Sequence, residues 1–420
     1  MSLTKCDVAV IGGGAIGLCS AYYLAQNGVS VVVIDKGEMG HGSSLHNAGY
    51  VCPSHFVPLA APGVFAQGLK WMFNPVSPLY IKPRLDIEFM SWVWRFARAC
   101  DDRRARRAMP ALCDLLLEGK RLYEELAGVE GVDFQLVKRG LVVLFNSEKG
   151  KRSCEHEVEL AHEVGIAAQM LDEHGLHRLD PVVDFRARGG TYFPGDMHLV
   201  PARLVKNLVD YLERQGVQLL RNCEVKSFKV SGKRIVSIGT SNGLINANDF
   251  VLAAGAWSPV LARDLGLKMH LQAGKGYSIT VNNPSVKPGF PYIFQERRVA
   301  VTPFADALRF AGTMEFAGID VSINQRRVEA ILDAIPYYFG NIPRPQSVSG
   351  EVWKGLRPVT PDGFPYLGRF TQIPNLIAAT GHAMLGISLA TVTGKVVSDI
   401  VQNRPADVDL TLLNPNRYDL

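Results

Sequence analysis

The sequence is poor in the features that mark several protein classes. Its seven cysteines are scattered and form no C-x-x-C pair, which argues against a disulfide framework, a zinc site or an iron–sulfur cluster and favours a reducing compartment. No apolar run approaches the roughly 20 residues of a membrane span. The net charge of +5 is small for 420 residues and gives no indication of nucleic-acid binding. We therefore expect a cytoplasmic globular protein of about two domains, without a metal site.

What the sequence does contain begins with CDVAVIGGGAIGLCSAYYLAQNGVSVVVID at residues 6–35. Two β-branched runs predict parallel strands on either side of a helix. Between them, Gly12 makes a tight turn, Gly14 lets the backbone approach a pyrophosphate and Gly17 lets the helix pack closely. Asp35 ends the second strand, where it would accept hydrogen bonds from ribose hydroxyls. The pattern predicts a dinucleotide that contains ADP, with a glycine-rich packing turn as the alternative. Further predicted contacts are Ala15, Ile16 and Lys36.

The next segment favours FAD over NAD. A nicotinamide-binding domain would normally continue with a helix and a third strand, whereas GHGSSLHNAGYVCPS (40–54) is dense in small and polar residues. Such a loop suits contacts that lead from the pyrophosphate towards an isoalloxazine ring. A flexible surface loop is the alternative. The candidate contacts are Ser43, Ser44, Asn47, Ala48, Gly49 and Tyr50.

Two later segments are expected to return to the same cleft. DFVLAAGAWS (249–258) is typical of a buried strand that runs into a turn, and residues 376–404 predict a strand, a glycine turn and an amphipathic helix. We expect this helix to begin between Leu385 and Ser388, where its N-terminus would stabilise negative charge on a reduced flavin. The cofactor contacts predicted here and nearby are Val225, Ala254, Gly255, Trp257, Gly355, Arg357, Gly381, His382, Met384, Leu385 and Gly386.

These motifs resemble those of the D-amino-acid oxidase superfamily of flavoproteins, and most closely those of the bacterial FAD-dependent D-amino-acid dehydrogenases. The resemblance covers nearly the whole chain. Besides the glycine turn with Asp35, it rests on SSLHNAGYVCPS (43–54), PLAAPG (58–63), GLKWMF (68–73), GTYFPGD (190–196), LAAGAWS (252–258), GKGYS (274–278), WKGLRPVTPDGFPYLGR (353–369) and TGHAMLG (380–386).

The resemblance implies an α/β fold of two domains. A discontinuous glutathione-reductase-type Rossmann domain for FAD would comprise residues 1–82, 191–262 and 347–420. An α+β substrate domain with an antiparallel sheet would comprise 83–190 and 263–346. Within the latter, VDFQLVKRGLVVLFN (132–146) predicts a hairpin that turns around residues 138–140.

The resemblance also implies a reaction. The enzyme would oxidise the Cα–N bond of an amino or imino acid, pass a hydride to flavin N5 and send electrons to a quinone or an electron-transfer protein. His55 and Phe56 after CPS, and Ala383 and Met384 after His382, depart from the common pattern, and they favour a cyclic substrate such as D-proline or hydroxy-D-proline. An oxygen-using oxidase, an NAD-dependent oxidoreductase and a non-catalytic FAD-binding subunit remain alternatives.

Five side chains are candidates for binding or orienting the substrate. Arg357 offers a bidentate site for a carboxylate, although it would also suit a flavin contact or an internal ion pair. Tyr277 and Arg309, both on predicted strands, would supply further carboxylate contacts; a core tyrosine and a solvated arginine are the alternatives. His55 and His382 titrate near neutral pH and would tune the protonation of the amine. For His382, packing against the flavin is the stronger alternative.

Cysteine tethers the flavin covalently in some relatives of this kind, and Cys52 lies in a predicted flavin loop. Ordinary burial is far more common for a cysteine, so we predict non-covalent FAD.

The region 89–109 combines aromatic residues with many arginines. Trp92, Trp94 and Phe96 lie beside this basic cluster, and the upstream segment 64–75 adds further aromatic residues. Such a composition suits a surface that rests on anionic lipid. A core helix that ends in a solvated basic segment is the alternative.

Overall fold

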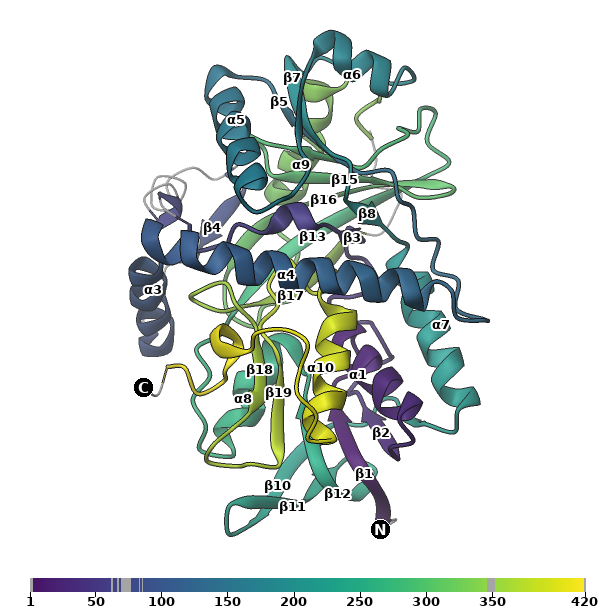
Figure 1. Cartoon of the computed structure of the whole chain (residues 1–420), viewed down its shortest axis with the longest axis vertical. Coiled ribbons are helices and arrows are strands. Elements are labelled where there is room, and N and C mark those ends of the chain that lie inside the picture. The colour runs from purple at the N-terminus through teal and green to yellow at the C-terminus, as the bar shows by residue number, and fades with distance from the viewer. Residues whose placement is uncertain are drawn as a thin grey trace.

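The computed structural model describes residues 3–61, 63–65, 68, 77–82, 84, 86–345 and 352–418. Two large sheets, each covered by helices, form its frame (Figure 1). The helices are α1 (Ala15–Gln26), α3 (Ile87–Ala99), α4 (Asp102–Leu126), α5 (Glu148–Glu163), α6 (Glu173–Leu179), α7 (Pro201–Arg214), α8 (Ser258–Arg263), α9 (Gln325–Tyr338) and α10 (Ala390–Val401).

The first sheet has eight strands around a parallel core in which β1 lies between β12 and β2. Its central strands are buried on both faces, because their apolar runs leave no polar side to expose. The strands are β1 (Leu3–Ile11), β2 (Val31–Ile34), β9 (Gln218–Leu220), β10 (Val225–Ser231), β11 (Arg234–Thr240), β12 (Gly243–Leu252), β18 (Tyr366–Arg369) and β19 (Leu376–Thr380).

Helices α1, α7, α10 and α4 pack around one another beside this sheet. The contact between α1 and α10 is close, because a Cβ at Gly394 would lie 2.5 Å from the backbone of Cys19. Helix α10 begins at Ala390 and not between Leu385 and Ser388, so the predicted start of this helix was wrong. The preceding residues form turns instead, and no side chain caps the helix.

The second sheet has nine strands and is antiparallel except for the pairs β14–β5 and β16–β4, which confirms the predicted antiparallel layer. Helices α5, α6 and α9 pack against it. The strands are β4 (Leu79–Ile81), β5 (Leu141–Phe145), β6 (Gln169–Asp172), β7 (Gly189–Phe193), β13 (Gln272–Asn282), β14 (Tyr292–Phe294), β15 (Val299–Pro303), β16 (Ala307–Phe316) and β17 (Trp353–Val359). A separate pair joins β3 (Tyr50–Val51) to β8 (Met197–His198).

Several elements differ from the sequence predictions. The predicted hairpin around residues 138–140 is absent from this described segment, because β5 pairs with β7 and β14. Strands β17 and β4 pair with the second sheet although the predicted boundaries assign them to the flavin domain. Helix α4, assigned to the substrate domain, packs on α10. The boundaries themselves stay a prediction.

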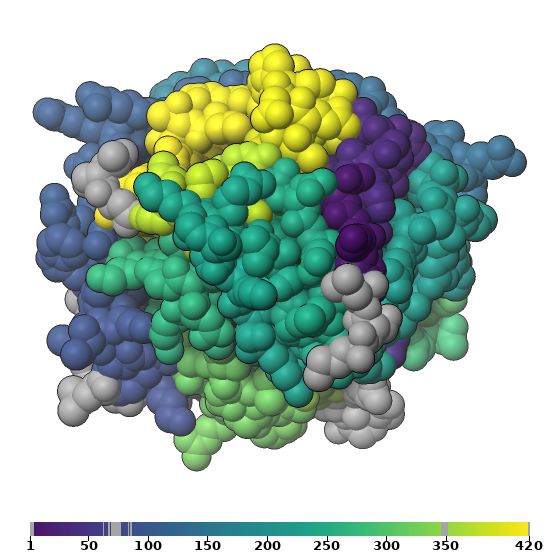
Figure 2. All heavy atoms as spheres, turned by 90° about the horizontal axis from the view of Figure 1, so that it is seen from below, coloured from purple at the N-terminus to yellow at the C-terminus, as the bar shows by residue number. Residues whose placement is uncertain are grey.

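Segments far apart in the sequence meet at one end of the molecule. Viewed from below, the N-terminal residues adjoin both the C-terminal segment and the segment that contains β10–β12 (Figure 2). Because β1, β2, β12 and β19 run parallel, their carboxyl ends lie at the same edge of the first sheet, which is the edge where a ligand binds in open parallel sheets.

Candidate active site

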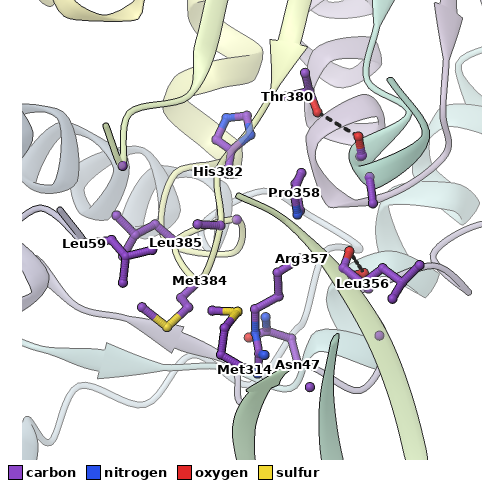
Figure 3. Close-up of a pocket in the computed structure, with 18 of the residues that line it drawn as sticks. Asn47, Leu59, Met314, Leu356, Arg357, Pro358, Thr380, His382, Met384 and Leu385 are labelled. Atoms are coloured by element: carbon purple, nitrogen blue, oxygen red, sulfur yellow. Dashed lines mark hydrogen bonds between the residues drawn. The ribbon is translucent and has the colours of Figure 1, made fainter. Parts of the chain in front are cut away.

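A cavity of about 2100 Å³ is lined by residues of both sheets. Its volume exceeds the roughly 300–1,000 Å³ of an ordinary small-molecule pocket. The cavity therefore has room for a large cofactor and a substrate together. Figure 3 shows the part of it around Arg357, where Met314 and Asn47 lie close to the guanidinium and Met384, Leu59 and Leu385 form a neighbouring wall.

The glycine turn lies at one end of this cavity. Gly12 has a φ of +116° and leaves no space for a side chain, since a Cβ there would lie 2.3 Å from the carbonyl oxygen of Ala253. A Cβ at Gly17 would lie 1.8 Å from the Gly12 oxygen, so α1 packs directly on the turn. The backbone N–H groups of Gly13 and Gly37 donate to the Asp35 carboxylate at 2.7 Å and 2.9 Å. The turn thus presents an acid and a helix N-terminus to the cavity.

The loop after β2 is held in place by side chains, which argues against a flexible surface loop. The N–H of Ala15 donates to Ser44 Oγ at 3.0 Å, which leaves the hydroxyl hydrogen for a phosphate oxygen. Ser43 donates to the carbonyl of Leu356 at 2.8 Å. Arg309 donates to the carbonyl of Asn47 at 2.7 Å, so this arginine fastens the loop from the second sheet.

Arg357 reaches the cavity wall and has no acidic partner in the described part of the chain. It is half-buried, and its Nη1 donates to the carbonyl of Thr313 at 2.7 Å. Burial lowers the pKa of the guanidinium to about 10, with no carboxylate to offset the desolvation. A desolvated, charged fork that lacks an acidic partner is suited to an anion from outside the protein.

Tyr277 and Arg309 are used inside the protein. Tyr277 lines the cavity, but its phenol donates to Glu315 Oε2 at 3.0 Å and accepts from the N–H of Asn324 at 3.1 Å. Arg309 lies outside the cavity lining and binds the 45–47 loop and Thr280. The structure therefore does not bring Arg309 to the place predicted for a carboxylate clamp.

Both candidate histidines line the cavity and are held neutral. Burial, together with the nearby Arg298, lowers the pKa of His55 to about 4. Burial alone lowers the pKa of His382 to about 3. The Nε2 atom of His382 lies 2.9 Å from Thr393 Oγ1, so this ring is anchored to α10. Neither ring carries charge at pH 7, and neither donates as an imidazolium.

Most of the predicted site residues line the same cavity. The exceptions are Gly17, Gly49, Gly381 and Arg309, which shape the surrounding backbone or fasten the loop. The prediction missed several lining residues, among them Leu59, Ser278, Gln295, Arg298, Thr313 and Met314. Leu59 and Ser278 lie within segments that carry the family resemblance but were not singled out there. Gln295 and Arg298 lie in the turn between β14 and β15, and Thr313 and Met314 lie on β16, outside any motif. The Ser278 hydroxyl is buried and has no hydrogen-bond partner among the described residues. An unpaired hydroxyl on an otherwise ordinary strand gives no sequence signal.

The described residues match neither the pattern of a metal site nor that of a membrane-spanning helix. No group of three or more potential metal ligands occurs there. No described helix is long and apolar enough to cross a membrane.

One family profile, described as DAO, FAD dependent oxidoreductase, matches residues 7–400. The chain belongs to this family. Similar curated proteins include the D-amino acid dehydrogenases of Paramagnetospirillum magneticum, 33% identical over 98% of both chains, and Xanthobacter autotrophicus, 30% identical over 98% of this chain and 99% of the relative. Among solved structures, glycine oxidase from Geobacillus kaustophilus has a TM-score of 0.79 at 23% identity, with 99% of both chains covered. L-proline dehydrogenase from P. horikoshii has a TM-score of 0.72 at 17% identity and covers 100% of this chain and 99% of its own.

The DAO family membership confirms the prediction of FAD in preference to NAD. The residues fit this cofactor, because Asp35, the N-terminus of α1 and Ser44 suit the ribose and phosphates, while the volume beside Arg357 remains for a ring and a substrate. The Cys52 thiol is buried and lies outside the cavity lining, 3.9 Å from the carbonyl of Met197. Burial also raises its pKa well above the ordinary value. These contacts agree with a flavin held without a thioether bond.

Proposed function

We propose that this chain is an FAD-dependent dehydrogenase of a D-amino acid or a cyclic D-imino acid. The observation that carries the proposal is Arg357, a cation on the cavity wall that no acid of the described chain neutralises. A substrate carboxylate would complete the hydrogen bonds of this guanidinium. The full-length similarity to proteins named D-amino acid dehydrogenase supports the same class of substrate.

The side chains around Arg357 are suited to position a substrate, and no carboxylate of the described residues acts on this guanidinium. Bound FAD supplies the acceptor for the hydride that leaves Cα. Arg357 fixes the carboxylate, which turns Cα in a defined direction. His55 is neutral at pH 7, so it would accept a hydrogen bond from the amine without adding a second positive charge. The substrate amine is therefore expected to react in its neutral form.

The walls near Arg357 favour a small apolar ring. Met314, Met384 and Leu59 surround this part of the cavity (Figure 3). We infer that D-proline or a hydroxy-D-proline fits here, because a pyrrolidine ring packs against thioether and aliphatic groups better than an ionic side chain does. The hydroxyl of Ser278 is available for a polar substituent or for the cofactor.

We also propose that electrons pass to a quinone and that helix α3 rests on the cytoplasmic face of a membrane. Ile87, Met90 and Trp94 project from one face of α3 and are 86%, 60% and 55% exposed. The guanidinium of Arg98 lies 4.8 Å from the Trp94 ring. This apolar and basic face suits an anionic lipid surface. Trp92 does not contribute, since it is buried and donates to the carbonyl of Val359.

The membrane proposal is tested by sedimentation with anionic liposomes at low and high salt. We expect binding at low ionic strength that weakens in salt and is lost in Trp94→Ala. Absence of binding at low ionic strength would reject this part of the proposal.

The reaction is tested with the purified holoenzyme and an artificial electron-accepting dye. We expect dye reduction with D-proline or cis-4-hydroxy-D-proline, little with their L-forms, and no stoichiometric hydrogen peroxide in air. Peroxide in amounts equal to product would indicate an oxidase instead. A flavin-loaded protein that reduces the dye with none of these amino acids would favour a non-catalytic FAD-binding subunit.

A further inference from the structure

Three neighbouring strands hold the guanidinium of Arg357. Strand β13 lies between β17 and β16, and Arg357 on β17 pairs with Gly274 on β13. Gly276 is two residues along β13 and so faces the same side of the sheet. A Cβ built on Gly276 would lie 2.1, 2.3 and 2.4 Å from Nη1, Nη2 and Cζ of Arg357. The guanidinium therefore occupies the space that a side chain at position 276 would need.

A positive φ is not the reason for glycine at position 276. Gly276 is not among the residues with positive φ, and it pairs with Gly355 on β17, while on its other side it lies opposite the bulge of β16. An alanine would adopt the same backbone conformation without strain. What the absence of a side chain provides here is room for the arginine tip.

Thr313 supplies the hydrogen bond that fixes this arginine. It has a φ of +72°, which is a rare conformation for a β-branched residue and costs energy. The ladder between β13 and β16 shifts register at this point, from Lys275 opposite Glu315 to Tyr277 opposite Gly312. A bulge of this kind redirects the backbone. Here the redirected carbonyl of Thr313 accepts from Arg357 Nη1 at 2.7 Å.

We propose that Gly276 and Thr313 are positioning residues for the arginine that binds the substrate carboxylate. The inference rests on the proposed role of Arg357. Gly276 leaves the space in which the guanidinium lies flat, and the Thr313 carbonyl sets its rotation. One N–H of the Arg357 guanidinium is taken by the Thr313 carbonyl, and its remaining N–H groups are available to a carboxylate in the cavity. The strained bulge is thus retained at the site where it orients a binding group.

The first test is Gly276→Ala. The clash involves only the end of a flexible side chain, so the protein is expected to fold and to keep its flavin while Arg357 moves. We expect KM for the D-amino or D-imino acid to rise at least tenfold, with a smaller change in kcat. Gly195→Ala is the matched control, because its Cβ would meet nothing nearer than Lys120 Nζ at 3.9 Å. This control should match the wild type in KM, flavin content and Tm.

A double-mutant cycle separates positioning from other effects. Arg357→Lys removes the planar fork, so adding Gly276→Ala to it should change KM by less than threefold. Thr313→Gly keeps the positive φ and the carbonyl, and its KM should stay within twofold of the wild type.

Each remaining outcome overturns a specific statement. If Arg357→Lys leaves KM unchanged, the proposed carboxylate role fails. If Arg357→Lys raises KM but Gly276→Ala does not, the positioning role of Gly276 fails while the proposed function stands. A loss of bound flavin or a lowered Tm in Gly276→Ala would also overturn the positioning role of Gly276, because the glycine would then be needed for the fold. A tenfold rise in KM for Thr313→Gly would assign the effect to the threonine side chain and not to its carbonyl.

Discussion

Replacement of Arg357 by methionine separates substrate binding from stability. Methionine fills a similar volume but lacks the charge and the two N–H groups that would face a carboxylate. Hydrogen bonds to a charged group contribute about 1.5–3 kcal/mol each, so two of them account for about 4 kcal/mol. By the relation of about 1.4 kcal/mol to each factor of ten, kcat/KM should fall roughly a thousandfold. Arg357→Lys keeps the positive charge but loses the planar guanidinium, so its kcat/KM should lie between that of Arg357→Met and that of the wild type.

The same replacement should not destabilise the fold. Burial lowers the pKa of Arg357, and no carboxylate of the described chain compensates the desolvation of its charge. Removing it therefore leaves no charged partner unpaired, and Tm should stay the same or rise. The assay is dye-linked turnover of a D-amino or D-imino acid beside thermal unfolding and flavin absorbance of each variant. A kcat/KM for Arg357→Met within threefold of the wild type would refute the reasoning.

Three further predictions concern the cofactor and pH. Asp35→Ala should yield protein largely free of FAD, because the Asp35 carboxylate both fixes the glycine turn through Gly13 and suits the ribose. Replacement of the exposed Asp7 by alanine is the control. Full flavin content in Asp35→Ala would contradict the assignment of Asp35 to the cofactor. Acid precipitation should release the flavin into the supernatant, since the Cys52 thiol lies outside the cavity lining; a yellow pellet would contradict this. The pKa of His382 is lowered to about 3 in the folded state against about 6.5 when unfolded, so unfolding takes up a proton and stability falls as the pH drops from 6.5 towards 4. His382→Gln should flatten the decline of Tm over this range, and an unchanged slope would be evidence against a buried neutral ring.

The glycine turn could be predicted from the sequence because its geometry depends on backbone space and local order. Gly12, Gly17 and Asp35 occupy fixed places between two apolar strands, and the strands pair in parallel as expected. The loop at 40–54 was also predicted to lie in the cavity, since small and polar residues permit close backbone contacts. Both features are local in the sequence.

Contacts between distant strands could not be predicted in this way. Alternation along β16 shows which residues share a face with Arg309, but it does not reveal that the carbonyl of Asn47 will lie within reach. The partners of β5 are β7 and β14, and local turn residues suggested a hairpin instead. The positive φ of Thr313 runs against the preference of a β-branched residue, so only the three-dimensional ladder reveals the bulge.

The start of α10 also could not be predicted correctly from the sequence. Apolar residues recur at Leu385, Ile387 and Leu389 just before the helix, and no capping side chain marks its beginning. Periodicity therefore placed the first turn too early. The structure still brings Met384, Leu385 and Gly386 to the cavity, but as a turn that precedes the helix.

The central claim is that a D-amino or D-imino acid reduces the flavin of this protein. The most direct measurement is an anaerobic titration of the yellow holoenzyme, in which D-proline, cis-4-hydroxy-D-proline, D-alanine, glycine, sarcosine and the L-forms are added separately. We predict that the visible flavin band bleaches with a D-imino or D-amino acid and persists with its L-form. A band that bleaches with none of them would contradict the proposed reaction and leave only the FAD site.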